Sequence, residues 1–413
     1  MINSPHQIPS KANFYMIHSL IRKNSNPIRK RCDNDDFTRL RNRYEIWYNI
    51  LQEQHGTRVF RGGKELVMLA SNEYLGLYDH PKVIEAGRKA LEKWGGGTMG
   101  ARSANGGRAF HAELEERLAA FVGKEACHVT SAGYLSCMSS ITGFARRGDA
   151  VLVDKNMHSS VWDGIRLSMA DVERFSHNNP DHLRSLLEQL DPNVAKIIAI
   201  EGIYSMEGHI CNLPEFTSIA QDFNCFTVMD DAHGIGVLGK QGQGTANHFG
   251  LTKQVDIITG SLSKSLGSTG GFIAGDAASI DYLRTHSKQV IFSAALSPCQ
   301  SACAMAALDV MDTEPEWLER LWANTKRYKA FLDDLKLDTW DSETPAIPII
   351  IGEREKAYHF WKNLRKKGVF AIFATAPGVP PGKDLVRTAI SARHTEEDFE
   401  IIEDAIRYAV SRM

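Results

Sequence analysis

Five short apolar runs, rich in β-branched residues, alternate with amphipathic segments through the middle of the chain. The runs cover residues 150–154, 195–201, 225–230, 255–259 and 271–274. Strand and helix in alternation favour a mostly parallel sheet with helices on both faces. We therefore predict an α/β fold with a mostly parallel central sheet, followed by a smaller α+β domain.

The rest of the chain predicts two flanking regions around a large domain of residues 66–298. Residues 1–65 combine a polar, basic, partly disordered tail over 1–35 with an amphipathic helix over 36–53. Residues 299–413 form the small C-terminal domain. Its expected elements are a long helical stretch over 299–335, a strand over 346–351, a helix over 356–367, a strand over 369–373 and a final helix from Thr395.

Polar residues follow four of the apolar runs. His158 comes after the first run, Glu201 ends the second, Asp230 ends the third, and Lys264 follows the fourth. In open α/β sheets, ligands bind in the crevice beyond the carboxyl ends of the strands. These four side chains are therefore expected to share one site.

Charge and composition point to a small-molecule partner. The chain has 48 basic and 50 acidic residues, a formal net charge of -2, which gives no reason to expect nucleic acid as a partner. No window reaches the roughly 18 apolar residues of a spanning helix, so at most peripheral membrane contact is expected. Seven scattered cysteines are typical of reduced thiols in a cytoplasmic protein.

The glycine cluster over residues 95–100 matches the spacing G-x-G-x-x-G. A dinucleotide-binding glycine motif must follow a strand and open a helix, so that the helix N-terminus meets the pyrophosphate. This cluster instead follows a helix that begins at Pro81 and ends at Trp94. It therefore does not indicate a nicotinamide or flavin site.

Small residues over 130–133 precede a helix that includes Tyr134. Free backbone N–H groups at a helix start can hold a phosphate, and an aromatic side chain can pack on a planar ring. Turns of this composition are also common without a ligand. Gly133 and Tyr134 are candidate cofactor contacts only in combination with the other motifs.

Asp230 ends an apolar strand and is followed by Asp231 and His233. A carboxylate here could cap a helix, bind a metal or hold the protonated nitrogen of a pyridine ring. Only Asp231 and His233 offer further metal ligands nearby, so no metal is predicted.

Lys264 lies in the sequence Ser-Leu-Ser-Lys-Ser-Leu-Gly at the end of another strand. An amine held in a crevice is desolvated, which lowers its pKa toward the nucleophilic form. Alone, this lysine could equally be a surface residue beside a serine-rich turn. With the phosphate-holding turn, His158 and Asp230, it forms the set that pyridoxal phosphate requires.

From about residue 36 to the C-terminus the chain resembles the α-oxoamine synthases, a family of fold-type I pyridoxal-phosphate enzymes. The resemblance rests on five motifs in order, which begin at Ser71, Glu201, Asp230, Ser261 and Phe292. It implies a homodimer with shared active sites. It also implies a C-acyltransferase that condenses a small amino acid with an acyl thioester, with loss of CO2, to give an α-amino ketone.

The resemblance also implies residue roles. It makes Lys264, His158 and Asp230 the catalytic residues: Lys264 binds the cofactor covalently, His158 stacks on its ring, and Asp230 pairs with its nitrogen. The other implied cofactor contacts are Gly133, Tyr134, Ser205, His233, Ser261, Ser263 and, from a second subunit, Ser293. Asn72 and Arg387 are the implied ligands of the substrate carboxylate.

Two departures leave the amino acid open among serine, alanine and glycine. Serine is favoured, but Ala101 stands where serine-using relatives have a serine, and the loop over 374–381 lacks an arginine that some relatives carry. A pocket hydroxyl can change substrate discrimination strongly. The alternative from another class is a non-catalytic partner subunit, although such relatives lack the lysine that is present here. The acyl chain and its carrier, coenzyme A or a carrier protein, stay open.

Overall fold

The computed structural model describes residues 26–413, and these residues form two compact units, up to Ile50 and from Leu51 onward. The first unit contains helices α2 (Pro27–Asp33) and α3 (Asp36–Tyr44). The prediction of one helix over 36–53 was wrong at its end, because Glu45 adopts a left-handed φ of 51° that stops α3. α2 also lies inside the predicted tail, whose residues 1–25 are outside the described part.

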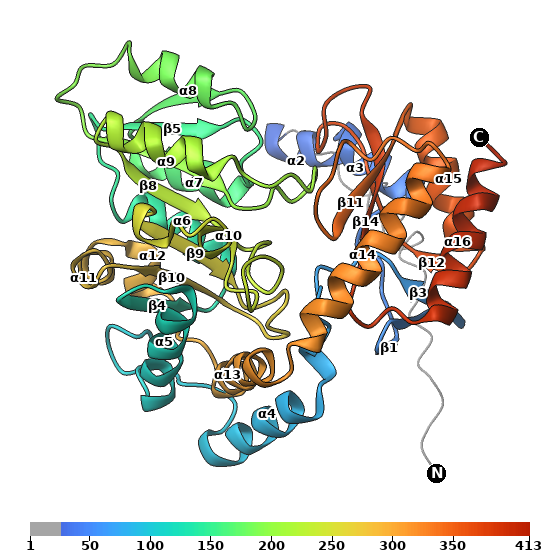
Figure 1. Ribbon diagram of the computed structural model, residues 1–413, viewed down its shortest axis with the longest axis horizontal. Helices are drawn as coiled ribbons and strands as arrows, with labels where there is room; N and C mark the ends of the chain where they lie inside the picture. The colour runs from blue at the N-terminus through green and yellow to red at the C-terminus, as the bar shows by residue number, and fades with distance from the viewer. Residues whose placement is uncertain (1–25) are drawn as a thin grey trace. The chain divides into compact units, whose positions relative to one another are not determined.

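The second unit is built on a seven-stranded sheet with the order β4-β10-β9-β8-β7-β5-β6 (Figure 1). β10 is antiparallel to both of its neighbours and all other pairs are parallel. The strands are β4 (Ala126–Thr130), β5 (Ala150–Asp154), β6 (Asp171–Phe175), β7 (Lys196–Glu201), β8 (Phe226–Asp230), β9 (Ile257–Ser261) and β10 (Gly271–Gly275).

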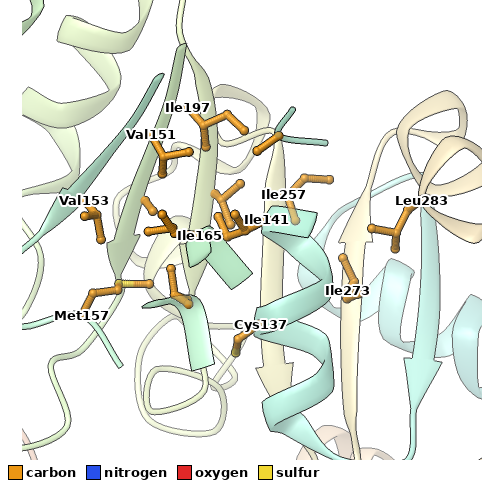
Figure 2. Packing of buried hydrophobic residues seen from close by; sticks show 14 of the residues in the cluster. Cys137, Ile141, Val151, Val153, Met157, Ile165, Ile197, Ile257, Ile273 and Leu283 are labelled. Atoms are coloured by element: carbon orange, nitrogen blue, oxygen red, sulfur yellow. The ribbon is translucent and has the colours of Figure 1, made fainter. Parts of the chain in front are cut away.

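Helices cover both faces of this sheet, as predicted, because successive strand residues point to opposite sides. Val151 and Val153 of β5 pack with α6, α7, α11 and α12, while Leu152 packs with α8 and α9 on the other face. Figure 2 shows the first of these clusters. The helices of this region are α4 (Pro81–Trp94), α5 (Ala109–Val122), α6 (Gly133–Thr142), α7 (Ser159–Ser168), α8 (Pro180–Leu187), α9 (Leu213–Asp222), α10 (Thr245–His248), α11 (Ala277–His286) and α12 (Lys288–Phe292), with short 3-10 turns η1 (Leu77–Asp79) and η2 (Thr252–Gln254).

The five predicted strands are present, whereas β4 and β6 are absent from the prediction. β6 lies at the edge of the sheet and carries Asp171, Glu173 and Arg174, so it has no apolar run to detect.

Two smaller sheets complete the second unit. One has the order β1-β2-β3-β12 and the other β11-β14-β13. Their strands are β1 (Glu53–His55), β2 (Arg58–Arg61), β3 (Lys64–Met68), β11 (Ala346–Gly352), β12 (Val369–Phe370), β13 (Ile372–Ala374) and β14 (Asp384–Ala389). β12 pairs in parallel with β3. The predicted strand over 369–373 is therefore two strands, which belong to different sheets.

Three helices accompany these sheets: α14 (Glu316–Asp334), α15 (Arg354–Lys366) and α16 (Glu396–Val410). A fourth helix, α13 (Pro298–Thr313), packs against α4 and α5. The predicted continuous stretch over 299–335 is divided because Pro315 follows Glu314, whose backbone is not helical. Within residues 26–413, no helix has the length and apolar character needed to cross a membrane.

Candidate active site

A cavity of about 170 Å³ lies where the carboxyl ends of β7, β8 and β9 meet the start of α6. All of the predicted cofactor contacts line it except Ser293. The lining residues are Gly133, Tyr134, Cys137, His158, Ser160, Glu201, Ser205, Asp230, Ala232, His233, Gly260, Ser261, Ser263 and Lys264. The strand ends thus bring together residues that are up to 131 positions apart, Gly133 and Lys264 being the extremes.

Lys264 follows β9 in a tight loop. Its carbonyl accepts a hydrogen bond from the Gly267 N–H at 2.9 Å, and the neighbouring Leu262 N–H donates to Gly270 O at 3.0 Å. Burial lowers the pKa of the Lys264 amine to about 8, although Asp230 and Glu201 act in the opposite direction. About a tenth of this amine is therefore neutral and nucleophilic at pH 7, far more than for an ordinary lysine.

Asp230 is buried at the end of β8 and its carboxylate is fixed by two donors. Its Oδ1 accepts a hydrogen bond from the Ala232 N–H at 3.0 Å, and its Oδ2 accepts one from the Cys137 thiol at 3.0 Å. Burial raises the pKa of Cys137 well above its usual value, so this residue stays a thiol and a donor. Sequence reasoning missed Cys137, because a cysteine inside the amphipathic pattern of α6 is indistinguishable from a core residue.

His158 and His233 line the cavity from different elements. His158 precedes α7, and its Nδ1 accepts a hydrogen bond from the Ser160 N–H at 3.3 Å. His233 Nδ1 lies 2.6 Å from the hydroxyl oxygen of buried Tyr74. Desolvation lowers the pKa of both histidines, and the Lys264 charge adds to this effect. Both rings are therefore neutral. Tyr74 lies in the motif that begins at Ser71 but was not predicted as a site residue.

One end of the cavity is suited to an anion. No side chain caps the start of α6 at Gly133, so its first N–H groups remain available. Ser261 and Ser263 lie beside it, with their hydroxyl oxygens 2.7 Å apart, and a Cβ at Gly133 would lie 3.2 Å from Ser261 Oγ. Hydroxyl donors and free N–H groups together match a phosphate.

The two predicted carboxylate ligands lie outside the cavity lining. Arg387 on β14 is buried, and its Nε donates to the carbonyl oxygen of Ser205, a lining residue, at 2.8 Å. Its Nη2 is buried without a hydrogen-bond partner, and so is Asn72 Oδ1. The Arg387 Nη2 donor lacks an acceptor, which a bound carboxylate would supply. Asn72 Oδ1 is itself an acceptor, so the amide N–H of Asn72 would have to make the contact with a carboxylate.

Ser293 does not reach the cavity of its own chain. It follows α12, in a segment that is bonded to residues 100–103: the Ala295 N–H donates to Gly100 O, and Ala101 forms a β-bridge with Ala294. Its expected role requires a second subunit and stays a prediction.

Asp231 points away from the cavity and is enclosed by glycines. Its carboxylate accepts hydrogen bonds from Thr245 Oγ1 at 2.6 Å and from the Thr245 N–H at 2.7 Å, and burial raises its pKa to about 7. A Cβ at Gly234 would lie 2.0 Å from its Oδ1. The turn that carries Asp230 and His233 is thus folded tightly around the Asp231 carboxylate. This carboxylate leaves no room for a side chain at position 234.

We expect Gly234→Ala to destabilise the protein by about 3 kcal/mol, because the added methyl group overpacks a buried polar contact. Urea or thermal unfolding measures the change. Gly96→Ala is the matched control, since an added Cβ there has no neighbour within 4 Å. Equal unfolding curves for the two variants would show that the turn around Asp231 can adjust to the added methyl group.

The cavity matches pyridoxal phosphate in its donor set. The amine of lowered pKa would bind the aldehyde, and the carboxylate fixed by two donors would hold the ring nitrogen. The uncapped helix start with its two hydroxyls would bind the phosphate. The histidine and tyrosine rings would contact the faces of the cofactor ring.

The chain is similar to known proteins over most of its length. Residues 64–406 match the family model described as aminotransferase class I and II. Serine palmitoyltransferase from Sphingobacterium spiritivorum is 42% identical over 364 residues, which cover 88% of this chain and 90% of that protein. 8-Amino-7-oxononanoate synthase from Thermoanaerobacter pseudethanolicus is 39% identical over 352 residues, 85% of this chain and 89% of that protein.

The chain is also similar to a solved structure. A serine palmitoyltransferase variant from S. paucimobilis with bound PLP and myriocin has a TM-score of 0.90 to this chain at 29% identity, over 92% of this chain and 98% of that one.

The sheet and its cavity define a pyridoxal-phosphate-dependent transferase of fold type I. The chain belongs to the aminotransferase class I and II family and, within it, to the α-oxoamine synthases, which are acyltransferases. The predicted family, fold, cofactor and enzyme class are thereby confirmed, and the individual residue roles stay predictions.

Proposed function

We propose that this protein condenses L-serine with an acyl thioester, releasing the thiol and CO2, to give an α-amino ketone. A carbon–carbon bond forms between the serine Cα and the acyl carbon, and the carboxylate is lost. The observation that carries this proposal is the cavity that holds Lys264 and Asp230 together, in a chain 42% identical to a serine palmitoyltransferase.

Lys264 is proposed to move the Cα proton. When bound, pyridoxal phosphate supplies an electron sink for negative charge that develops at the Cα of an amino acid. The Lys264 amine, with its pKa lowered to about 8, is able to take the Cα proton onto Nζ near neutral pH.

The remaining roles follow from the polar atoms around Lys264. Asp230, fixed by Ala232 and Cys137, holds the proton on the ring nitrogen. When the cofactor is bound, His158 would cover one ring face, and His233 and Ser205 would lie toward the ring oxygen, as the resemblance to the α-oxoamine synthases implies. Arg387 offers its orphaned Nη2, and Asn72 its amide, to the amino-acid carboxylate.

Alanine and glycine are the second candidates. The 39% identity to 8-amino-7-oxononanoate synthase is close to the 42% identity to serine palmitoyltransferase. Ala101 lacks the hydroxyl that would favour serine, and it lies in the segment bridged to Ala294. Serine remains favoured by the match to serine palmitoyltransferase in both sequence and solved structures.

Exchange of the Cα proton in D2O tests the amino acid without an acyl donor. We expect serine to exchange at least about 10-fold faster than alanine or glycine, a ratio that corresponds to about 1.4 kcal/mol. Proton NMR of each amino acid with the purified protein follows the loss of the Cα signal. If alanine exchanges its Cα proton faster than serine does, alanine is the substrate and the assignment of serine is wrong.

A homodimer is proposed as the working assembly, with Ser293 contributed to the second cavity. Large apolar side chains are exposed near the segment that carries Ser293: Phe292 is 79% exposed and Met99 83%. Exposed apolar side chains of this size are typical of a contact surface.

We further propose a cytoplasmic location, which the free state of all seven cysteines supports. We also propose that the large domain ends at residue 298 and that the small C-terminal domain follows it.

A further inference from the structure

Glu201 is a buried carboxyl group of the cavity lining to which the proposed reaction assigns no role. It ends β7 beside Asp230, which ends β8, and the two residues are Cα partners in the parallel ladder. Glu201 is only 2% exposed. The cavity therefore holds two carboxyl groups side by side at adjacent strand ends.

The contacts of the two carboxyl groups differ. Asp230 accepts hydrogen bonds on both oxygens, from the Ala232 N–H and the Cys137 thiol. Glu201 accepts one, from the Ser205 N–H to Oε2 at 3.2 Å, while its Oε1 is buried without a partner. Among residues 26–413, no lysine, arginine or histidine forms an ion pair with Glu201 within 4 Å. A buried carboxylate without a cation is strongly destabilised, and an adjacent carboxylate increases that cost.

We propose that Glu201 is a positioning residue that stays protonated in the folded protein, so that Asp230 is the ionised member of this strand-end pair and can hold a proton on the ring nitrogen of the cofactor. A neutral Glu201 places no second negative charge beside the carboxylate that accepts hydrogen bonds from Ala232 and Cys137. The inference deepens the proposed site, but it does not depend on which amino acid is the substrate.

The charges around Glu201 support this assignment. Burial is the main cause that raises its pKa well above the usual value, followed by the neighbouring Asp230 and Glu207 carboxyl groups. Lys264 acts in the opposite direction. Tyr204 and Cys211 also face Glu201, and burial keeps both of them neutral.

The sign of the pH dependence follows from the raised pKa. In the unfolded chain Glu201 ionises above its ordinary pKa of about 4.3, whereas in the folded protein it stays protonated. The stability that this group contributes is full below that unfolded pKa and is lost as pH rises toward the folded pKa. Glu201→Gln, which keeps the shape and a neutral amide, should escape this loss.

Glu201→Gln in the full-length protein tests the inference, with the exposed Glu116→Gln as control. We expect Glu201→Gln to raise the melting temperature of the cofactor-free protein by on the order of 3 °C at pH 8 and to leave it unchanged at pH 4.5. Glu116→Gln should follow the wild type at both pH values. The variant should also bind pyridoxal phosphate, titrated by fluorescence, within about 3-fold of the wild-type affinity.

A second measurement covers the case in which the variant folds poorly. Infrared spectroscopy of the wild-type protein at pH 8 should show the carbonyl band of a buried carboxylic acid, and this band should be weaker in Glu201→Gln but not in Glu116→Gln. Absence of the band, a melting temperature at pH 8 that is not raised, or a loss of cofactor affinity of about 10-fold or more would each overturn the inference. If serine instead fails to exchange its Cα proton, the proposed function is wrong while these readouts still judge Glu201.

Discussion

Lys264→Ala should reduce turnover by about 10⁴-fold or more and remove the yellow colour of the bound cofactor. The substitution deletes both the covalent attachment and the general base, and acid–base catalysis alone contributes about 10² to 10⁴-fold. Lys264 is the one lysine that lines the cavity of the described chain, so no neighbouring amine replaces it. Steady-state assays of thiol release and the visible absorption spectrum measure the two effects.

Lys253→Ala is the control for this experiment, because Lys253 is an exposed residue of the short turn η2. It should keep both the colour and the activity. A Lys264→Ala protein that retains more than about a hundredth of wild-type turnover would place the base on another residue.

Asp230→Asn should reduce Cα-proton exchange by about 10² to 10³-fold while part of the cofactor stays bound. The amide keeps the shape of the side chain, and its oxygen can still accept the hydrogen bond from the Ala232 N–H. It cannot carry the negative charge that keeps the ring nitrogen protonated, and removal of one preorganised electrostatic group costs about this factor. Exchange in D2O and the cofactor content of the purified variant are measured together.

Asp191→Asn, at an exposed position, controls for the loss of one carboxylate elsewhere. It should exchange at the wild-type rate. Equal exchange rates in Asp230→Asn and the wild type would contradict the role of Asp230, and complete loss of cofactor would make that role one of binding rather than of charge.

Sequence reasoning reached the central sheet because its buried strands are short apolar runs. β5 over Ala150–Asp154 has the predicted bounds, and the polar residues at the strand ends line one cavity. β6 was not predicted, because it lies at the sheet edge and is mostly charged. The end of α3 was misplaced because apolar residues continue at helical spacing past Glu45, whose left-handed backbone has no signature in the sequence.

The sequence predicted a site residue only where that residue lies next to a strand end or belongs to a motif shared with the α-oxoamine synthases. Cys137, Ser160 and Ala232 line the cavity through the pairing of distant elements, and no local pattern marks them. Tyr74 contacts His233 across 159 positions. Such contacts depend on strand order and side-chain rotamers, which periodicity does not specify.

The most direct test of the central assignment is to locate the covalently held cofactor. Borohydride reduction of the purified protein, followed by proteolysis and mass spectrometry, identifies the lysine that becomes permanently modified. We expect the modification on Lys264, with none after Lys264→Ala. A reduced cofactor on any other lysine of the wild-type protein would contradict the assignment of this cavity as the active site.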